Sequence, residues 1–200
     1  MTLNSSWRSI SVGPFVLAAA IAAAGCHRRA EQTIGAECLS NVKLVDTQGK
    51  PFELSSLKGK PVVVDFIYTS CPGPCLMETA KLANVALRLG PDLGSKVAMV
   101  SLTVDPEHDG ASQMRDYVEK QGADFKGWYF LTGSPPDVDD ALAGFKLARQ
   151  REPDGSVAHL VTMVLVGPDG REIQEYNGES VKAQTIVEDV KKVLSGEKVS

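Results

Sequence analysis

The stretch from Val62 to Cys75, which reads VVVDFIYTSCPGPC, decides how this chain folds. Its first part, Val62–Tyr68, is almost entirely apolar or β-branched, which predicts a strand buried on both faces of a sheet. Cys71 and Cys75 follow where a helix is expected to begin. Residues four apart on a helix lie on one face with Cβ atoms about 5–6 Å apart. Two thiols placed in this way can share one soft metal ion or close into a disulfide.

The sequence around this stretch alternates between strand and helix patterns. Strands, including those of two hairpins, are expected at 42–46, 51–54, 97–104, 128–131, 160–166 and 173–176. Helices are expected at 75–89, 111–121, 136–145 and 181–194. The strand at 128–131 is expected to be short or to lie at an edge. This order predicts an α/β, thioredoxin-like fold, with a central mixed sheet flanked by helices and an added N-terminal β-hairpin.

A ligand site is expected at the carboxyl edge of such a sheet, where strands end and helices begin. Cys71 and Cys75 lie at this edge, and His159, at the start of a strand, is the candidate third ligand. Two thiolates and one imidazole suit Cu(I), and Cu(II) when an oxygen completes the set; zinc also accepts Cys₂His with a fourth ligand. The helix N-terminus is expected to lower the thiol pKa, and Cys71 is expected to be the more exposed sulfur.

Other residues with metal-binding or orienting chemistry are weaker candidates. His108 is either a rival ligand on a loop at the same edge or a solvated side chain. Asp105 is either a partner that orients His159 or its own loop, or a turn-forming residue. Met77 and Met99 are interpreted as core residues rather than thioether ligands.

The N-terminus has the pattern of an export signal. Arg8 precedes an apolar run of about 13 residues, too short for a typical membrane span. The run ends in small residues before Cys26, as in the bacterial lipobox, whose cysteine is lipidated; an uncleaved signal anchor and a conventional cleaved signal are the alternatives. We therefore expect a signal at 1–26, a polar tether at 27–39 and a thioredoxin-like domain at 40–200, lipid-anchored outside the cytoplasm. Cys38 is interpreted as a small buried hydrophobe.

Composition limits the possible functions. The chain is 43% hydrophobic and 23% charged, which suits a packed core. Its net charge of −4 does not favour nucleic-acid binding, which needs a basic face. With Cys26 lipidated, three cysteines remain, so a disulfide framework is not expected. Nucleotide-binding and serine-hydrolase motifs are absent from the sequence.

Several motifs fall on the expected strands and loops. They are the strand and CPGPC motif within Val64–Cys75, the SLTVDPE loop at Ser101–Glu107, the WYFLTG strand at Trp128–Gly133, His159, and the GPDG turn at Gly167–Gly170. Together these motifs, spread over about residues 42–194, resemble the Sco/SenC family of copper-handling proteins tied to cytochrome c oxidase assembly. The chain departs from the family pattern at Leu76, His108 and Leu160, where proline, arginine, and serine or threonine are common.

The resemblance implies a membrane-tethered copper chaperone with Cys71, Cys75 and His159 as ligands. Its expected partners are the copper-site subunit of cytochrome c oxidase or another copper chaperone. The alternative is a thiol–disulfide oxidoreductase of the envelope, in which Cys71 attacks and Cys75 resolves, without need of His159. A peroxidase is a further, weaker reading, since nothing in the sequence marks a single peroxidatic cysteine.

Overall fold

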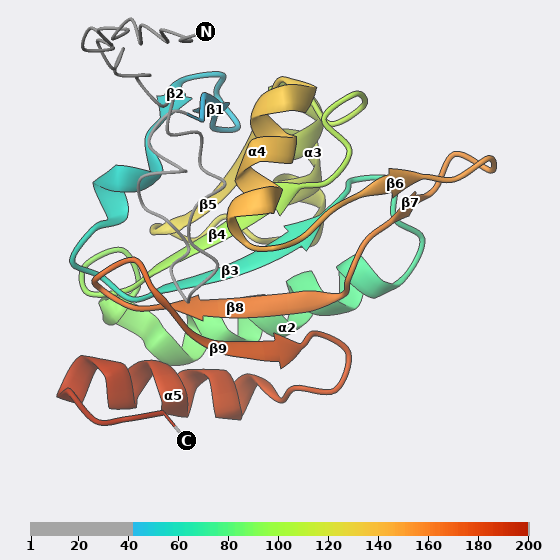
Figure 1. The fold of residues 1–200 in the computed structure, drawn as a ribbon. Helices are drawn as coiled ribbons and strands as arrows, with labels where there is room; N and C mark the ends of the chain where they lie inside the picture. The colour runs from blue at the N-terminus through green and yellow to red at the C-terminus, as the bar shows by residue number, and fades with distance from the viewer. Residues whose placement is uncertain (1–41, 200) are drawn as a thin grey trace, which may run out of the picture. The chain divides into compact units, whose positions relative to one another are not determined.

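The chain is described by a computed structural model that covers residues 42–199 of the 200. Its central element is a seven-stranded sheet in the order β2-β1-β5-β4-β3-β8-β9 (Figure 1). The strands are β1 Leu44–Val45, β2 Pro51–Phe52, β3 Val62–Ile67, β4 Ala98–Thr103, β5 Trp128–Gly133, β8 Thr162–Val166 and β9 Glu172–Asn177. The three inner strands β3, β4 and β5 run parallel, and the remaining neighbours pair antiparallel. The sheet is therefore mixed, as the sequence predicts.

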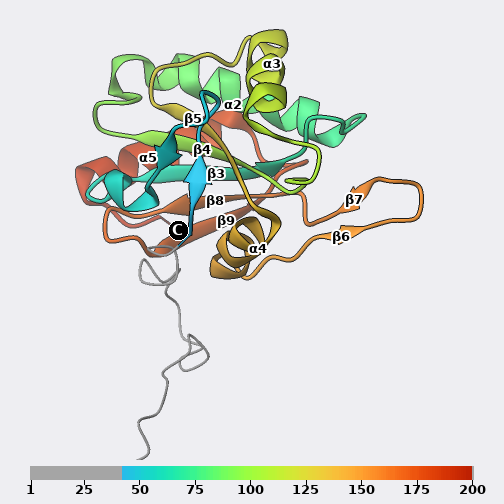
Figure 2. The same cartoon turned by 90° about the horizontal axis from the view of Figure 1, so that it is seen from above.

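Within residues 42–199, four α-helices lie against this sheet. They are α2 Pro74–Leu89, α3 Ala111–Gln121, α4 Pro135–Gly144 and α5 Ala183–Ser195. The crossovers β3-α2-β4 and β4-α3-β5 step across the sheet in the same direction, so right-handed connections place both helices on one face. Figure 2 shows α2 and α3 on that face and α4 on the opposite one. Helix α5 packs beside α2. The thioredoxin-like expectation is confirmed.

The N-terminal hairpin occupies a different place from the one its sequence position suggests. Strands β1 and β2 form the expected hairpin, and β1 also pairs antiparallel with β5, matching Leu44 to Gly133. Strand β5 consequently has neighbours on both sides, and the expectation that residues 128–131 form an edge strand is wrong. Strand order depends on pairing between distant segments, so the local sequence pattern cannot predict it.

Two further features differ from the sequence expectations. Leu76, Ala80, Ala83 and Leu87 have the helical spacing that indicates α2, yet Leu87 is 68% exposed. The buried face consists instead of Cys75, Glu78, Thr79, Leu82, Val85, Ala86 and Leu89. Met77 is 71% exposed, so its interpretation as a core residue is wrong, whereas Met99 is fully buried as expected. Because Glu78 and Thr79 are polar, a hydrophobicity pattern does not identify this face as the buried one.

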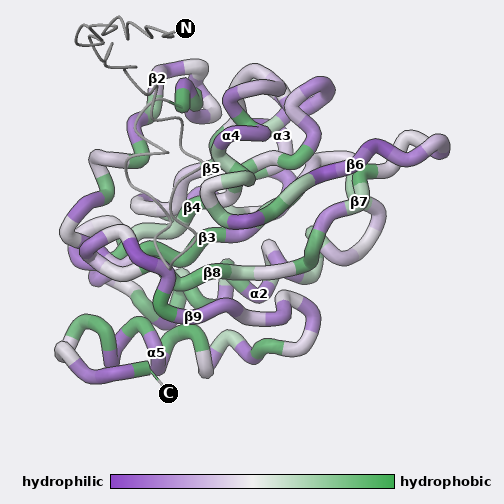
Figure 3. Tube along the Cα trace, viewed as in Figure 1, coloured by the Kyte–Doolittle hydropathy of each residue, from purple (hydrophilic) through white to green (hydrophobic). Residues whose placement is uncertain are grey.

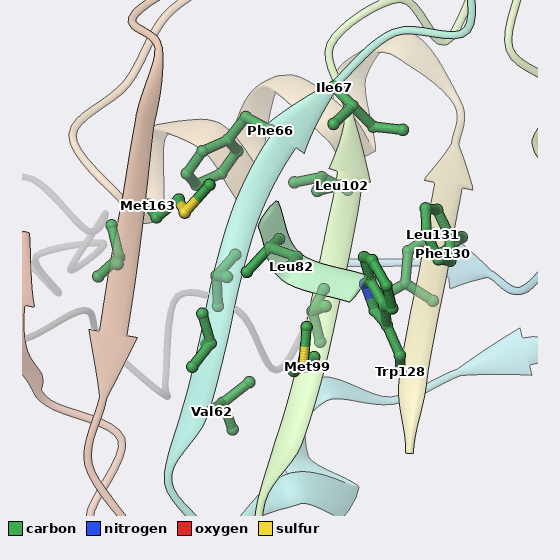
Figure 4. Packing of buried hydrophobic residues seen from close by; sticks show 14 of the residues in the cluster. Val62, Phe66, Ile67, Leu82, Met99, Leu102, Trp128, Phe130, Leu131 and Met163 are labelled. Carbon is green, nitrogen blue, oxygen red and sulfur yellow. The ribbon is translucent and has the colours of Figure 1, made fainter. Parts of the chain in front are cut away.

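The hydrophobic core lies between the sheet and its helices. Figure 4 shows Phe66, Leu82, Leu102 and Met163 packed around β3 and β4. Figure 3 shows hydrophobic residues along β3, β4 and β8, whereas the β6–β7 hairpin is largely hydrophilic. Full burial of the central strands on both faces explains their continuous apolar sequence.

The predicted signal and tether, with Cys26 and Cys38, lie outside the described residues. Among residues 42–199, the structure contains no helix long and apolar enough to cross a membrane.

Candidate functional site

The cysteine pair lies where the sequence predicts, between the end of β3 and the start of α2. The backbone amide of Cys71 donates to the carbonyl of Tyr68 at 3.2 Å, which turns the chain after the strand. The Cys75 amide donates to the Cys71 Sγ at 3.4 Å, so the first turn of the helix directs a donor at the first sulfur. Both cysteines are free thiols. This geometry suits a thiol pair that reacts or binds as a unit.

Both cysteines are more buried than the sequence suggests. Cys71 is 6% exposed and Cys75 is not exposed, so Cys71 is the more accessible by a small margin only. Pro72 and Pro74 of the same turn are exposed. Burial raises the pKa of the Cys75 thiol, and its interaction with Cys71 adds to this rise. The expected lowering by the helix N-terminus is therefore wrong for Cys75, because loss of solvation outweighs the helix dipole.

Tyr68 is a site residue that the sequence reasoning missed. It is 7% exposed, and its ring lies edge-on to the His159 ring, with centroids 6.0 Å apart. Burial raises the pKa of the Tyr68 phenol to about 12, and its interaction with Cys71 adds to that. Tyr68 therefore lies against the histidine through its ring and against the thiol turn through its backbone carbonyl. Its position at the end of the apolar run Val62–Tyr68, just before the thiol turn, could have identified it as a site residue.

His159 follows β7 and is half-buried. Its Nδ1 donates to the Leu160 carbonyl at 2.9 Å, because a carbonyl oxygen can only accept. The proton is thereby held on Nδ1, and Nε2 keeps a free lone pair, the form in which imidazole binds metals. Burial lowers the pKa of His159, which keeps the ring neutral. Across residues 42–199, no three His, Cys, Asp or Glu side chains lie close enough together to hold a metal ion.

The loop after β4 is ordered by charges of its own. Asp105 is 2% exposed and pairs with Arg151 and, at 2.9 Å, with His108. The suggestion that Asp105 orients His159 is therefore wrong, and its role in orienting the loop is supported. The His108 side chain is 64% exposed. It lies on this loop as a solvated partner of Asp105.

Asp109 anchors the thiol turn to this loop. It is fully buried, and its carboxylate accepts from the Thr69 amide at 3.0 Å and the Thr103 hydroxyl at 2.7 Å. Thr69 lies two residues before Cys71, so the carboxylate fixes the backbone that enters the turn. Sequence reasoning missed Asp109 because an Asp in a loop usually faces solvent.

Two buried carboxyl groups lie beneath the thiols. Glu78 is 1% exposed and Asp65 is not exposed. Both Glu78 oxygens and the Asp65 Oδ2 are the buried side-chain atoms that lack a hydrogen-bond partner in the described part of the chain. Burial raises the pKa of Asp65 to about 7 and of Glu78 to about 8, and the nearby Asp65 carboxyl adds to the rise for Glu78. The Asp65 Oδ1 accepts from the Ser101 hydroxyl, whereas neither Glu78 oxygen has a partner, so burial favours the neutral form of Glu78.

The fold and the thiol turn define a thioredoxin-like protein with a Cys-x-x-x-Cys pair at the carboxyl edge of its sheet. The SCO1/SenC family model matches residues 30–195. The chain therefore belongs to the SCO1/SenC family. It is 35% identical over 147 residues to a SCO1 protein homolog of Bacillus subtilis, covering 72% of this chain and 76% of the relative.

Solved structures agree with this assignment. A SCO1/SenC family lipoprotein from Bacillus anthracis has a TM-score of 0.69 at 28% identity, covering 76% of this chain and 92% of that one. Bradyrhizobium japonicum ScoI, solved with copper bound, has a TM-score of 0.66 at 26% identity, with 76% and 96% covered. BsSco, described with a disulfide switch and as a member of the Sco family of cytochrome c oxidase assembly proteins, has a TM-score of 0.66 at 34% identity, with 76% and 91% covered.

Proposed function

We propose that this chain is an exported, membrane-tethered copper-binding chaperone for assembly of the copper centre of cytochrome c oxidase. Copper is held by the sulfurs of Cys71 and Cys75 and by the Nε2 of His159. The observation that carries the proposal is the position of Tyr68, whose ring lies edge-on to the His159 ring and whose backbone carbonyl accepts from the Cys71 amide. Tyr68 therefore connects the segment of His159 to the turn that carries Cys71 and Cys75.

The chemistry of the donor set supports copper as cargo. Thiolates are soft ligands that select Cu(I), and a neutral imidazole adds a third donor. The Nδ1 bond to the Leu160 carbonyl leaves the Nε2 lone pair free to bind a metal. In copper transfer, an incoming thiolate of a partner displaces one cysteine at a time, which the exposed prolines of the turn favour. The partner is the copper-site subunit of the oxidase or another copper chaperone.

Export and tethering are proposed from the N-terminal sequence. The apolar run and the small residues before Cys26 favour a lipidated cysteine. The similarity to a SCO1/SenC family lipoprotein supports a place in the cell envelope. A mass spectrum of the protein from membranes tests it, since cleavage before Cys26 with added acyl chains is expected, and an unmodified N-terminus contradicts it.

A second candidate is a thiol–disulfide oxidoreductase that uses the same cysteine pair. The close approach of the Cys75 amide to the Cys71 sulfur favours it, since the pair is already compact. So does the absence of a three-residue metal cluster within residues 42–199. This activity requires both thiols but not His159.

One experiment separates the two functions. Cu(I) affinity of the reduced, full-length protein is measured by competition with a chromophoric Cu(I) chelator, for wild type and His159→Ala. If the protein is a copper chaperone, His159→Ala should lower Cu(I) affinity by more than about a hundredfold. Loss of a residue that only hydrogen-bonds to a metal ligand typically costs about 10- to 100-fold. His108→Ala is the matched control, because His108 is a solvated histidine of the neighbouring loop.

The same variants are assayed for reduction of a model disulfide. Exchange should survive in His159→Ala and vanish in Cys71→Ser. In addition, Cu(II) loading of the reduced wild type should produce an intense sulfur-to-copper charge-transfer band. Unchanged copper affinity in His159→Ala, or an unchanged band in Cys71→Ser, rejects the ligand assignment.

A further inference from the structure

The segment that carries His159 is a projecting hairpin that the sequence did not predict. Strands β6 Gln150–Arg151 and β7 Val157–Ala158 form a separate two-stranded sheet, which extends beyond the main sheet (Figures 1 and 2). Only two residue pairs join the strands, and isolated hairpins of this size are marginally stable in water. We call residues 149–159 the His arm. Something outside the hairpin must therefore hold the His arm in place.

Arg149 connects the base of the arm to two other elements. Its guanidinium forms a bidentate pair with Glu107, at 2.6 and 2.9 Å, on the loop after β4. The Nε of Arg149 donates to Asp139 of α4 at 2.7 Å. The Arg149 side chain is only 12% exposed, so water screens these pairs less than ordinary surface ion pairs.

Arg151, the last residue of β6, makes a similar connection. Both arginines face the β4–α3 loop, since each lies within ion-pair distance of Glu107. Arg151 pairs with the buried Asp105 and lies 3.5 Å from Glu107. It also donates to the Gly155 carbonyl at 3.0 Å, which closes the hairpin turn on the same side chain.

We propose that Arg149 and Arg151 form a latch that fixes the His arm to the β4–α3 loop and thereby sets the position of His159 relative to the two cysteines. The inference rests on the proposed copper function and names the positioning residues of that same site. Both arginines lie eight or more residues before His159, so they act on copper only through the placement of the arm.

Several ion pairs act together to restrain the His arm. A single exposed ion pair contributes little, about 0–1 kcal/mol. The latch instead joins two guanidinium groups to three carboxylates, one of them buried, with bidentate geometry that adds direction. The restraint acts on a hairpin with little stability of its own. Because the pairs are ionic, the latch should weaken as salt rises.

The test is a double-mutant cycle in the full-length reduced protein. Cu(I) affinity is measured for wild type, Arg149→Gln/Arg151→Gln, His159→Ala and the triple variant. We expect the arginine substitutions to weaken Cu(I) binding by about tenfold in the wild-type background, the lower end for lost outer partners. In the His159→Ala background the arginine substitutions should change Cu(I) affinity less than about twofold. The latch acts on copper only through His159, so its loss has no further effect once His159 is removed.

Amide hydrogen exchange supplies the second measurement. The amides of β6 and β7 should exchange about fivefold faster or more in the arginine variant, since the hairpin opens locally. Arg171→Gln is the matched control, because Arg171 is exposed and pairs loosely with Asp169 at 3.8 Å in the β8–β9 turn. If the double substitution impairs folding, Glu107→Gln removes the carboxylate shared by both arginines while leaving both in place.

Each outcome decides the inference. Equal losses of copper affinity with and without His159 overturn the latch, because they indicate a general loss of structure. Unchanged arm exchange together with unchanged copper affinity also overturns it. An unaltered affinity in His159→Ala alone rejects the proposed ligand set instead, and a faster-exchanging arm in the arginine variant would then show that the failure lies with the function and not with the restraint.

Discussion

The ring of Tyr68 lies edge-on to the imidazole of His159, with centroids 6.0 Å apart and planes at 84°. Tyr68 ends the strand run that leads to Cys71, and His159 ends the projecting arm. The contact joins segments about ninety residues apart in sequence, and it borders the thiol turn. Edge-to-face contacts of this kind contribute about 0.5–1.5 kcal/mol beyond their buried area.

This contact predicts different effects for two substitutions of Tyr68. Tyr68→Leu removes the aromatic edge that holds His159, so Cu(I) affinity should fall about fivefold, equivalent to about 1 kcal/mol. Tyr68→Phe keeps the ring and should stay within about twofold of wild type. Chelator competition measures both, with thermal unfolding as a check on folding. Equal losses in the two variants would assign the effect to the phenol and its contact with Cys71.

Oxidation of Cys71 and Cys75 to a disulfide should abolish copper binding. A disulfide has no thiolate to offer, and metal binding requires deprotonated sulfur. Copper content of the oxidised and re-reduced protein, measured by elemental analysis, checks this. Stoichiometric copper on the oxidised protein would count against both cysteines as ligands, and failure to regain copper after reduction would indicate damage rather than a switch.

Stability should fall as pH rises through the neutral range. The folded pKa of Glu78 is about 8 and that of Asp65 about 7, raised from ordinary values of 4.5 and 3.8. Between about pH 4 and 8 the folded state therefore keeps protons that the unfolded state has lost. The free energy of unfolding then decreases with pH, by about 1 kcal/mol per pH unit for each acid that stays protonated.

Glu78→Gln tests this dependence. The neutral amide cannot ionise, so the variant should gain stability relative to wild type as pH rises from 5 to 9, as measured by urea unfolding. The charged and titratable groups that act on Glu78 or are acted on by it are Asp65, Lys81, Cys71, Cys75 and Glu179. Glu119→Gln, at an exposed site on α3, is the control and should show no such trend. A pH-independent difference between Glu78→Gln and wild type would refute a neutral Glu78.

Gly178 is required by the close approach of Glu78. A Cβ added at Gly178 would lie 1.8 Å from Glu78 Oε1, a distance that no real contact allows. Gly178→Ala should therefore destabilise the fold by about 1–3 kcal/mol in chemical unfolding, as overpacking does. Glu78→Asp shortens the acid, and in combination with Gly178→Ala it should recover part of the loss. Gly110→Ala is the control, since its Cβ would meet only the end of the Gln113 side chain.

Local sequence predicted the elements because their periods are local. The apolar run Val62–Tyr68 predicts the buried central strand, and β3 occupies Val62–Ile67. Residues 111–121 were predicted as a helix with the bounds that α3 has. The short hairpin β6–β7 was missed because each strand has two residues, too few for a period to appear. The edge assignment of β5 failed because strand neighbours are set across the chain.

In the candidate site too, the sequence predicted the local features and missed those that depend on distant segments. Cys71 and Cys75 were predicted as a pair from their four-residue spacing. The structure brings them together through the turn before α2, where the Cys75 amide donates to the Cys71 sulfur. Asp109 was missed, and so was the partner of Asp105, because Thr69 lies 40 residues from Asp109 and Arg151 lies 46 from Asp105. The assignment of His159 as a metal ligand stays a prediction.

By itself, the sequence of this chain determined its succession of strands and helices and the thiol pair at the end of the central strand. Hydrophobic periods and a four-residue spacing act within one or two turns of chain, where geometry is nearly fixed. Only the tertiary structure decided that Tyr68 meets His159, that Glu78 is buried without a hydrogen-bond partner, and that Arg149 and Arg151 pair with carboxylates outside the His arm. Those relationships depend on strand order and on packing between distant segments. Burial there removes water, so the energy of each polar group depends on the protein partners it finds.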